Sequence, residues 1–438
     1  MVDLPLGYQP SFIVVNTDDA PLDQYDNMPG MEAAWLADFI DYTLNGSTNM
    51  PLCLPGRAAG FSGLRVEHHR GFGNSDGSNV DLDNTFIEAL HRAGYLTAAV
   101  GKWLNGFGEG GDAGFGTQER QPGVDFQRIY WGAPTYYDYD VVDENGDLTH
   151  YGSAEADYAT DVQGQHCIDF LNSIPSNRPF CLYWAPRAPH AGFTPANRHL
   201  SSNVSVTKGA SWGLLPSKYG NAAWLDDAAD DWGDADAVAQ LITDHTNGNR
   251  AVLSVDEWLV DIMEHIQASG RINDTIVILK TDNAHAFGEL RQSDKGIPHK
   301  AASSMLLMVR VPGISGGTRR HAVSDIDVAP TICRLAGASM RRASDGMSFH
   351  KTFSSATAPH RRCALNASPS KPPTFGALWY EDGRVYYEGW ELGQASGAIG
   401  CWTEADQIRD QGPQPDAAAE LAALQAYSYP AAPDEDGH

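Results

Sequence analysis

The chain has 438 residues, which is enough for one large domain with a substantial core and a smaller second domain. Asp and Glu number 56 against 30 Lys and Arg, so the net charge is −26 at pH 7. This acidic balance argues against a nucleic-acid-binding protein and against a protein that binds anionic membrane surfaces. No apolar run in the sequence is long enough to span a membrane. We therefore expect neither nucleic acid nor a membrane among the partners.

The N-terminus, residues 1–5, has no basic region and no apolar stretch after it, so no signal peptide is visible. This pattern favours a cytoplasmic location. Secretion or a periplasmic location is the alternative if the chain has been trimmed.

Short apolar runs alternate with segments of helical periodicity along most of the chain. The runs that predict buried strands are residues 11–16, 96–100, 179–184, 275–279 and 305–309. The segments that predict helices are residues 28–44, 80–93, 156–172, 252–269 and 325–335. This alternation predicts an α/β fold with a large, mostly parallel mixed sheet covered by helices on both faces.

Two polar stretches, residues 106–155 and 201–246, are expected to be long excursions that select the substrate. The first should contain a hairpin around Asn145-Gly146. The residue pattern changes after residue 349. Segments 378–380 and 385–387 predict an antiparallel hairpin, and residues 415–427 predict a final helix. We therefore predict a catalytic α/β domain over residues 1–350 and a smaller C-terminal α+β subdomain over residues 351–438, with a small antiparallel sheet and a helix.

Polar residues follow several of the predicted strands, at the point where each strand ends. They are Asp18 with Asp19, Lys102, His190, and Asp282 with Asn283. Each alone fits a solvated turn, but ligands of such sheets bind outside the carboxyl ends of the strands, so we expect these residues to converge. The three aspartates and the asparagine offer only oxygen ligands, which suits Ca²⁺ or Mg²⁺ better than zinc.

The segment Cys53-Leu54-Pro55-Gly56-Arg57 places a thiol at the start of a bent turn. Arg57 lies about one helical turn past Cys53, where its planar cation can bind an anion beside the sulfur. A helix that begins here would aim its free N–H groups at the same point. Alone, the segment also fits a buried structural cysteine. With the strand-end residues it suits displacement at a sulfuryl or phosphoryl centre, with His190 protonating the leaving oxygen.

The order of these motifs resembles the type I sulfatases of the alkaline phosphatase-like superfamily. The matching pieces are Asn16-Thr17-Asp18-Asp19, the Cys-x-Pro-x-Arg signature at Cys53, Gly101-Lys102-Trp103, Ala188-Pro189-His190, Thr281-Asp282-Asn283 and Lys295. The resemblance implies a Ca²⁺ ion, with Mg²⁺ as the alternative, held by Asp18, Asp19, Cys53, Asp282 and Asn283. It also implies that a formylglycine-generating enzyme oxidises Cys53 to formylglycine, whose hydrated aldehyde is the nucleophile.

The same resemblance implies that Arg57, Lys102 and Lys295 bind the sulfate and that His190 acts at the leaving oxygen. The run from Gly101 to Asn105 is most similar to the N-acetylglucosamine-6-sulfatase branch. Leu104 stands where many sulfatases carry a histidine, which leaves the base of the second step open, with Asn105 and His69 as candidates. Gly56 and Ala284 also depart from the family pattern.

These observations predict a sulfuric ester hydrolase that acts on an aryl or sugar sulfate, either a small molecule or a saccharide. Two other interpretations stay open. One is a phosphonate monoester hydrolase or phosphodiesterase of the same superfamily. The other is a non-catalytic relative that binds sulfated carbohydrates and keeps Cys53 unmodified.

Overall fold

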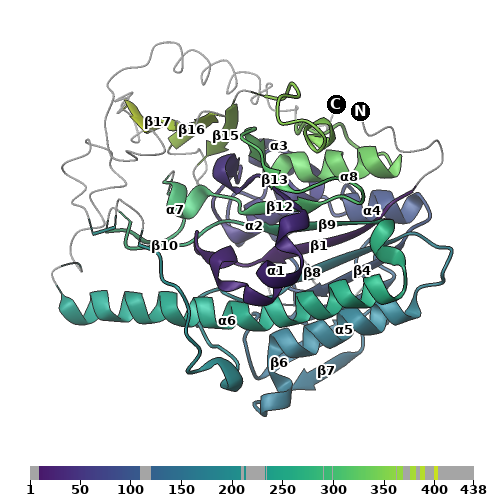
Figure 1. Cartoon of the computed structure of the whole chain (residues 1–438), viewed down its shortest axis with the longest axis horizontal. Helices are drawn as coiled ribbons and strands as arrows, with labels where there is room; N and C mark the ends of the chain where they lie inside the picture. The colour runs from purple at the N-terminus through teal and green to yellow at the C-terminus, as the bar shows by residue number, and fades with distance from the viewer. Residues whose placement is uncertain are drawn as a thin grey trace.

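The computed structural model describes residues 9–108, 120–208, 212, 213, 232, 234–289, 291–297 and 299–361, and beyond these the backbone of four strands. A ten-stranded sheet lies at its centre (Figure 1). Its inner strands are β9 (Thr275–Thr281), β1 (Ser11–Thr17), β8 (Phe180–Ala185), β4 (Leu96–Gly101) and β5 (Phe126–Trp131). Its outer strands are β13 (Gly317–Thr318), β2 (Phe39–Asp41), β12 (Leu307–Arg310), β6 (Tyr139–Asp143) and β7 (Leu148–Tyr151).

The strand order is β13-β2-β12-β9-β1-β8-β4-β5-β6-β7. The five inner strands pair in parallel, from β9 across to β5. On the outside, β12 pairs antiparallel with both β9 and β2, and β6 pairs antiparallel with both β5 and β7. The predicted large, mostly parallel mixed sheet is confirmed.

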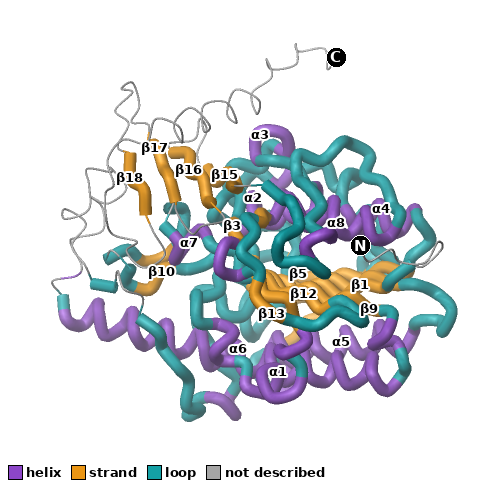
Figure 2. Tube along the Cα trace, turned by 45° about the horizontal axis from the view of Figure 1, so that its top comes forward, coloured by secondary structure: helices purple, strands orange, loops and turns teal. Residues whose placement is uncertain are grey.

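Helices cover both faces of the sheet, as Figure 2 shows. One face carries α2 (Cys53–Ser62), α4 (Phe86–Arg92) and α8 (Val328–Ala336), and the other carries α1 (Pro29–Ala34), α5 (Ala159–Ser173) and α6 (Ala235–Ala268). The smaller elements are α3 (Val66–His69), α7 (Lys300–Ser303), the β3 (Gly46–Ser47) and β14 (Val323–Ser324) pair, and the β10 (Ala286–Phe287) and β11 (Ser293–Asp294) pair.

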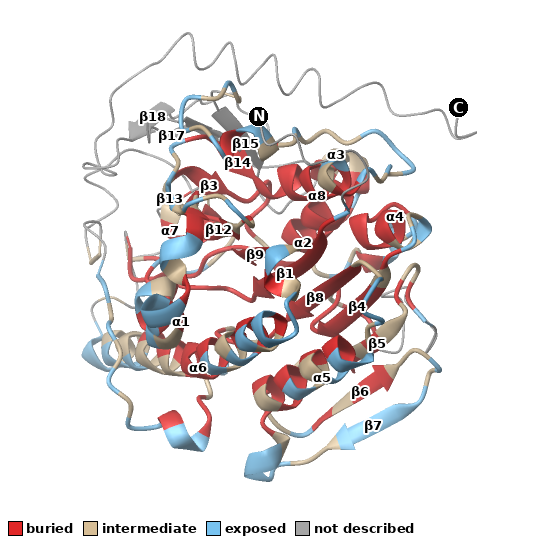
Figure 3. Ribbon diagram, turned by 45° about the vertical axis from the view of Figure 1, so that its right-hand side comes forward, coloured by how far each residue is buried: buried red, intermediate tan, exposed pale blue. Residues whose placement is uncertain are grey.

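The continuous apolar sequence of β1 follows from this layering, because successive side chains of a strand point to opposite faces. Phe12 and Val14 belong to the core under α2, α4 and α8. Ile13 and Val15 belong to the core under α5 and α6. Figure 3 shows the inner strands buried between the two helical layers. The strand is thus held from both sides, which makes its carboxyl end a rigid platform.

Several predicted boundaries are wrong. Residues 28–44 do not form one helix. Helix α1 ends at Ala34, and strand β2 begins at Phe39, where Phe39 and Ile40 pair with β12. Pairing and burial of these two side chains outweigh the local helical pattern. The helix of residues 80–93 begins only at Phe86, after a cap in which the Thr85 side chain accepts the N–H of Glu88.

Both predicted excursions are shorter than expected. The stretch 106–155 contains β5, β6 and β7, so part of it belongs to the sheet, and the hairpin at Asn145-Gly146 joins β6 to β7. In the stretch 201–246, α6 begins at Ala235, earlier than residue 252.

The C-terminal strands β15 (Cys363–Ala367), β16 (Phe375–Tyr380), β17 (Val385–Gly389) and β18 (Ile399–Trp402) form a separate antiparallel sheet, and the predicted hairpin is the β16–β17 pair. The predicted helix at residues 415–427 lies outside the described residues, and the domain boundary near residue 350 stays a prediction. Within the described residues, no helix is both long and apolar enough to cross a membrane.

Candidate active site

The predicted strand-end residues meet at the carboxyl edge of the sheet. They are Asp18 and Asp19 after β1, Lys102 after β4, His190 after β8, and Asp282 with Asn283 after β9. A parallel bridge between Asp18 and Pro189 continues the β1–β8 pairing beyond the strands and carries His190 into the site. Asp19 adopts a positive φ of 55°, and its backbone N–H donates to Asp282 Oδ1 at 3.1 Å. The edge of the sheet therefore brings distant parts of the sequence together.

Cys53 is the first residue of α2, a helix that is buried along its whole length. Pro55 lies in the first turn, where its missing N–H costs no helical hydrogen bond. Gly56 is required by close approach, because a Cβ at that position would lie 2.6 Å from the carbonyl oxygen of Asp282. This contact explains the glycine that departs from the family pattern: it lets the start of α2 pack directly against the end of β9.

Each of the three buried aspartates carries a cationic partner. The pairs are Lys102 with Asp18, Arg57 with Asp282 and Lys295 with Asp19. Lys102 Nζ lies 2.9 and 2.6 Å from the two carboxylate oxygens of Asp18. Equal numbers of opposite charges make it feasible to bury the cluster, whereas removing one partner would leave an uncompensated buried charge.

Burial opposes ionisation of the two aspartates after β1, but the neighbouring cations outweigh it. Lys102, His190 and Arg57 together hold the pKa of Asp18 well below its ordinary value. Lys295 and His190 lower the pKa of Asp19 in the same way. Both carboxylates are therefore charged at neutral pH and available to a cation.

The thiol of Cys53 faces this cluster. Its Sγ lies 2.9 Å from Lys295 Nζ and 3.6 Å from Asp19 Oδ1. Burial, helped by the charge of Asp19, raises the pKa of Cys53 to about 12. The unmodified side chain is thus a protonated, weakly nucleophilic thiol at neutral pH.

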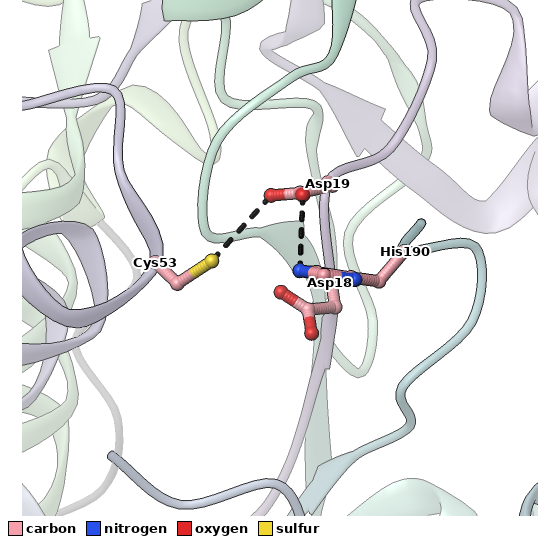
Figure 4. Close-up of side chains that lie close together, drawn as sticks. All are labelled: Asp18, Asp19, Cys53 and His190. Atoms are coloured by element: carbon pink, nitrogen blue, oxygen red, sulfur yellow. Dashed lines mark hydrogen bonds and ion pairs between the residues drawn. The ribbon is translucent and has the colours of Figure 1, made fainter. Parts of the chain in front are cut away.

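His190 approaches from the other side of Asp19, and Figure 4 shows the Asp19 carboxylate between Cys53 and His190. Its Nε2 lies 3.3 Å from Asp19 Oδ2. Its Nδ1 is 3.2 Å from the carbonyl oxygen of Ala191, which identifies Nδ1 as the donor, and Tyr136 Oη donates to the backbone carbonyl of His190 at 2.9 Å. Burial lowers the pKa of His190 despite the nearby Asp18 and Asp19. The ring is thereby held with Nε2 toward the site.

Of the possible ligand atoms at this edge, the carboxylate oxygens of Asp18 and Asp19 suit a hard cation, whereas the unmodified Cys53 thiol and the His190 ring suit softer ions. One ligand atom each from Asp18, Asp19, Cys53 and His190 lies within 4.8 Å of the others. Asn283 Nδ2 donates to Asp19 Oδ1 at 2.7 Å, while Asn283 Oδ1 is buried without a hydrogen-bond partner among the described residues. A buried carbonyl oxygen left unpaired is costly, and a bound cation would satisfy it.

Asp282 lies beside this group but has a different environment. Its Oδ1 accepts the backbone N–H groups of Asp19 and Asn283, and its Oδ2 accepts Nε of Arg57 at 2.9 Å. Burial, with the charges of Asp18 and Asp19, raises the pKa of Asp282. The structure brings this residue to the site as predicted, and its role as a metal ligand stays a prediction.

The sequence analysis predicts no functional role for two residues that lie near the site, Tyr183 and His285. Tyr183 Oη accepts from Asn16 Nδ2 at 3.1 Å and from Arg57 Nη1 at 3.4 Å, so it helps to orient the arginine. His285 Nδ1 lies 4.0 Å from Asp19 Oδ2. Tyr183 lies inside an apolar strand, so the sequence alone gives no reason to assign it a function. His285 lies two residues after Asn283, and this proximity could have indicated a position near the site.

The fold and the carboxyl-edge site together define an alkaline phosphatase-like α/β protein. The Sulfatase family model matches residues 24–338. The chain therefore belongs to the sulfatase family, and the resemblance inferred from the motif order is confirmed.

Curated relatives agree with the branch inferred from the sequence. The chain is 28% identical to N-acetylglucosamine-6-sulfatase of Homo sapiens over 329 residues, which cover 68% of this chain and 56% of the relative. It is 25% identical to N-acetylglucosamine-6-O-sulfatase of Bacteroides thetaiotaomicron over 350 residues, which cover 65% of this chain and 59% of the relative. The chain thus spans little more than half the length of these relatives.

Solved structures confirm the fold. A structure described as a complex with its substrate D-glucosamine-2-N,6-O-disulfate has a TM-score of 0.75 at 20% identity, with 96% of this chain and 97% of that chain covered. Phosphonate monoester hydrolase of Agrobacterium radiobacter has a TM-score of 0.72 at 15% identity, with 96% of each chain covered. At these identities the likeness concerns the fold alone.

Proposed function

We propose that the protein is a sulfuric ester hydrolase that acts on a sulfate monoester of a sugar or aryl alcohol. Membership of the sulfatase family supports this proposal. The observation that carries it is the position of Cys53 Sγ, 2.9 Å from Lys295 Nζ, beside a cluster of buried cations and carboxylates. A nucleophile formed at this position would meet an anionic ester that the cations neutralise.

The cationic groups have distinct parts in binding the sulfuryl group. Lys102 and Lys295 are held by Asp18 and Asp19, so each can share its charge with an oxygen of the ester. Arg57 is fixed more firmly, because Nε donates to Asp282 and Nη1 donates to the carbonyl oxygen of Lys102 at 3.0 Å. No described residue accepts a hydrogen bond from its Nη2, which is 3.4 Å from Asp18 Oδ1. That group is the available donor for an incoming oxyanion.

His190 is the proposed acid at the leaving oxygen. Its Nδ1 is anchored on a backbone carbonyl, so Nε2 faces the site. A proton carried on Nε2 passes to the oxygen of the alcohol as its bond to sulfur breaks. With Nδ1–H donated to a carbonyl, a proton on Nε2 makes the ring cationic; burial lowers the pKa of His190, and the charges of Asp18 and Asp19 offset part of that effect.

Two groups added to the chain complete the proposed reaction. Asp18, Asp19 and Asn283, together with Asp282 and the modified Cys53, would hold Ca²⁺ or in its place Mg²⁺, which would supply Lewis-acid polarisation of the sulfuryl oxygens. Formylglycine, made from Cys53 by a formylglycine-generating enzyme, supplies the hydrated aldehyde nucleophile. The high pKa of the unmodified thiol is consistent with a requirement for this conversion.

The relatives suggest the alcohol half of the substrate. Relatives with 25–28% identity are named N-acetylglucosamine-6-sulfatase or N-acetylglucosamine-6-O-sulfatase, which favours a 6-sulfated amino sugar as substrate. We therefore propose such a sugar sulfate as the first compound to test.

The test compares sulfate release from N-acetylglucosamine 6-sulfate and 4-nitrophenyl sulfate with hydrolysis of a phenyl phosphonate monoester. The protein is produced together with a formylglycine-generating enzyme and assayed with Ca²⁺, with Cys53→Ala as control. We expect sulfate release that the control lacks. Faster turnover of the phosphonate would favour the second candidate function, which the similarity to phosphonate monoester hydrolases supports at the level of fold. Binding of sulfated sugars without turnover would favour the non-catalytic alternative.

A further inference from the structure

His285 is held rigidly at the edge of the site. Its backbone N–H donates to the carbonyl oxygen of Ala20 at 3.2 Å, and a parallel bridge pairs Ala284 with the same residue. The residue is 8% exposed. The segment after β9 thus extends the pairing with the segment after β1, which places this histidine beside Asp19.

The orientation of the His285 ring is set by aromatic neighbours. Phe193 packs edge-on against it at a centroid distance of 5.7 Å, and Phe287 lies at 4.4 Å. These contacts limit rotation of the ring, so the position of its Nδ1 is defined by packing.

The Nδ1 atom of His285 is buried and has no hydrogen-bond partner among the described residues. It lies 4.0 Å from Asp19 Oδ2 and 3.8 Å from Asp294 Oδ1, and both distances are too long for a hydrogen bond. The same Asp19 oxygen contacts Lys295 Nζ and lies 3.3 Å from His190 Nε2. Three nitrogen groups therefore converge on this oxygen, and His285 Nδ1 lies 4.0 Å from it without a hydrogen bond to any described residue.

We propose that His285 is a further sulfate-binding residue whose Nδ1–H donates a hydrogen bond to a sulfuryl oxygen beside Lys295. This assignment rests on the proposed function. The neutral ring supplies the donor in one of its two tautomers, so the contact needs no change of charge. The interaction would satisfy a buried polar atom that the protein alone leaves unpaired.

The test uses the affinity of the purified protein for inorganic sulfate, measured by calorimetry, and KM for 4-nitrophenyl sulfate. His285→Phe keeps a ring between the aromatic neighbours and removes the donor, whereas His285→Asn keeps a donor near Nδ1. The matched control is His245→Gln, because His245 is also buried, stacks on Phe287 at 4.4 Å and bonds to Asp23 through Nε2.

We expect His285→Phe to weaken sulfate binding and raise KM by about tenfold, which is the usual effect of losing one hydrogen bond to a charged group. His285→Asn should restore most of the affinity, and His245→Gln should match the wild type. Unchanged sulfate affinity in a folded His285→Phe variant would overturn the assignment. In the wild-type protein, addition of sulfate should also shift the ¹⁵N resonance of His285 Nδ1, and a resonance that does not move would contradict the contact even if the variant fails to fold.

The two proposals fail in different ways. Wild-type protein that binds sulfate through His285 but hydrolyses no sulfate ester would contradict the proposed function and leave the His285 assignment intact. Hydrolysis by the wild type with an unchanged KM in His285→Phe would contradict the assignment alone. Wild-type protein that neither binds sulfate nor hydrolyses an ester would contradict both.

Discussion

Lys295 Nζ lies 2.9 Å from Cys53 Sγ, although the two residues are 242 positions apart in the chain. The lysine also contacts Asp19, and it keeps a high pKa against the effect of burial because Asp19 lies beside it. The cation nevertheless does not ionise the thiol, since burial raises the pKa of Cys53. The cation beside the sulfur is consistent with the proposed binding of an anionic ester there, and the raised pKa keeps the unmodified thiol in its weakly nucleophilic protonated form at neutral pH.

Replacing Lys102 by methionine should destabilise the protein strongly. The change leaves the buried carboxylate of Asp18 without its closest cation, and we expect the free energy of unfolding to fall by about 3–5 kcal/mol. Denaturant unfolding measures the effect. Arg92→Met is the control, because Arg92 is 43% exposed and its buried partner Glu88 keeps Arg341 as a second cation at 2.8 Å, so the loss should cost about 1 kcal/mol. Equal effects of the two changes would contradict the role given to the buried pair.

Two glycines of α2 provide a matched test of how closely this helix approaches the sheet. A Cβ on Gly56 would lie 2.6 Å from the carbonyl oxygen of Asp282, so Gly56→Ala should cost about 1–3 kcal/mol of stability and reduce activity. At Gly60 the nearest atom to such a Cβ is Lys280 Nζ at 3.8 Å, so Gly60→Ala should be neutral or stabilise the helix by up to about 1 kcal/mol. Thermal unfolding and sulfate release measure both variants. Normal activity in Gly56→Ala would show that α2 can shift away from the Asp282 carbonyl without loss of function, which would contradict the need for close approach at this position.

Calcium should stabilise the protein through Asn283. Ligand binding to the folded state raises the free energy of unfolding, by about 2.7 kcal/mol when the free ion is at a hundred times its Kd. We expect Ca²⁺ to raise the melting temperature of the wild type, EDTA to reverse the rise, and Asn283→Leu to abolish most of it, because the unpaired Oδ1 is lost. The same rise in Asn283→Leu would argue against the proposed ligand set.

His69 should make the protein less stable in acid. Burial lowers the pKa of His69 to about 3, below the value of about 6.5 for an unfolded histidine. Between these values the unfolded state binds a proton that the folded state does not, so stability is lost as the pH falls from about 6.5 to about 3. The contribution to the slope reaches about 1.4 kcal/mol per pH unit.

The check is urea unfolding at several pH values between 4 and 7 on wild type and on His69→Asn. The asparagine can keep the acceptor that Nδ1 offers to the backbone N–H of Gly71. The variant should show a shallower dependence on pH. An unchanged slope would mean that other groups govern the loss of stability in acid.

Much of the architecture could be predicted because it depends on local pattern. The apolar runs at β1, β8 and β9 identify strands buried on both faces, and the polar residues that follow them, such as Asp18 and Asp282, identify the edge where they meet. The strand β2 could not be predicted in this way, because Phe39 and Ile40 form it only by pairing with β12, far away in the sequence.

The same limit applies to the site. Gly56 looks like an unexplained departure in the sequence, and its reason appears only in the contact with the Asp282 carbonyl. His285 is one of several histidines near the metal-ligand motif, and its buried, unpaired Nδ1 becomes visible only when Phe193 and Phe287 are packed around it. Tertiary contacts decide these features, and local pattern does not encode them.

The most direct test of the central claim is the mass of the peptide that contains Cys53, measured on protein that releases sulfate from an ester. We predict an aldehyde in place of the thiol in the active protein, and activity that rises in proportion to the converted fraction. Full hydrolytic activity in protein whose Cys53 is an unmodified thiol, or in Cys53→Ala, would contradict the account.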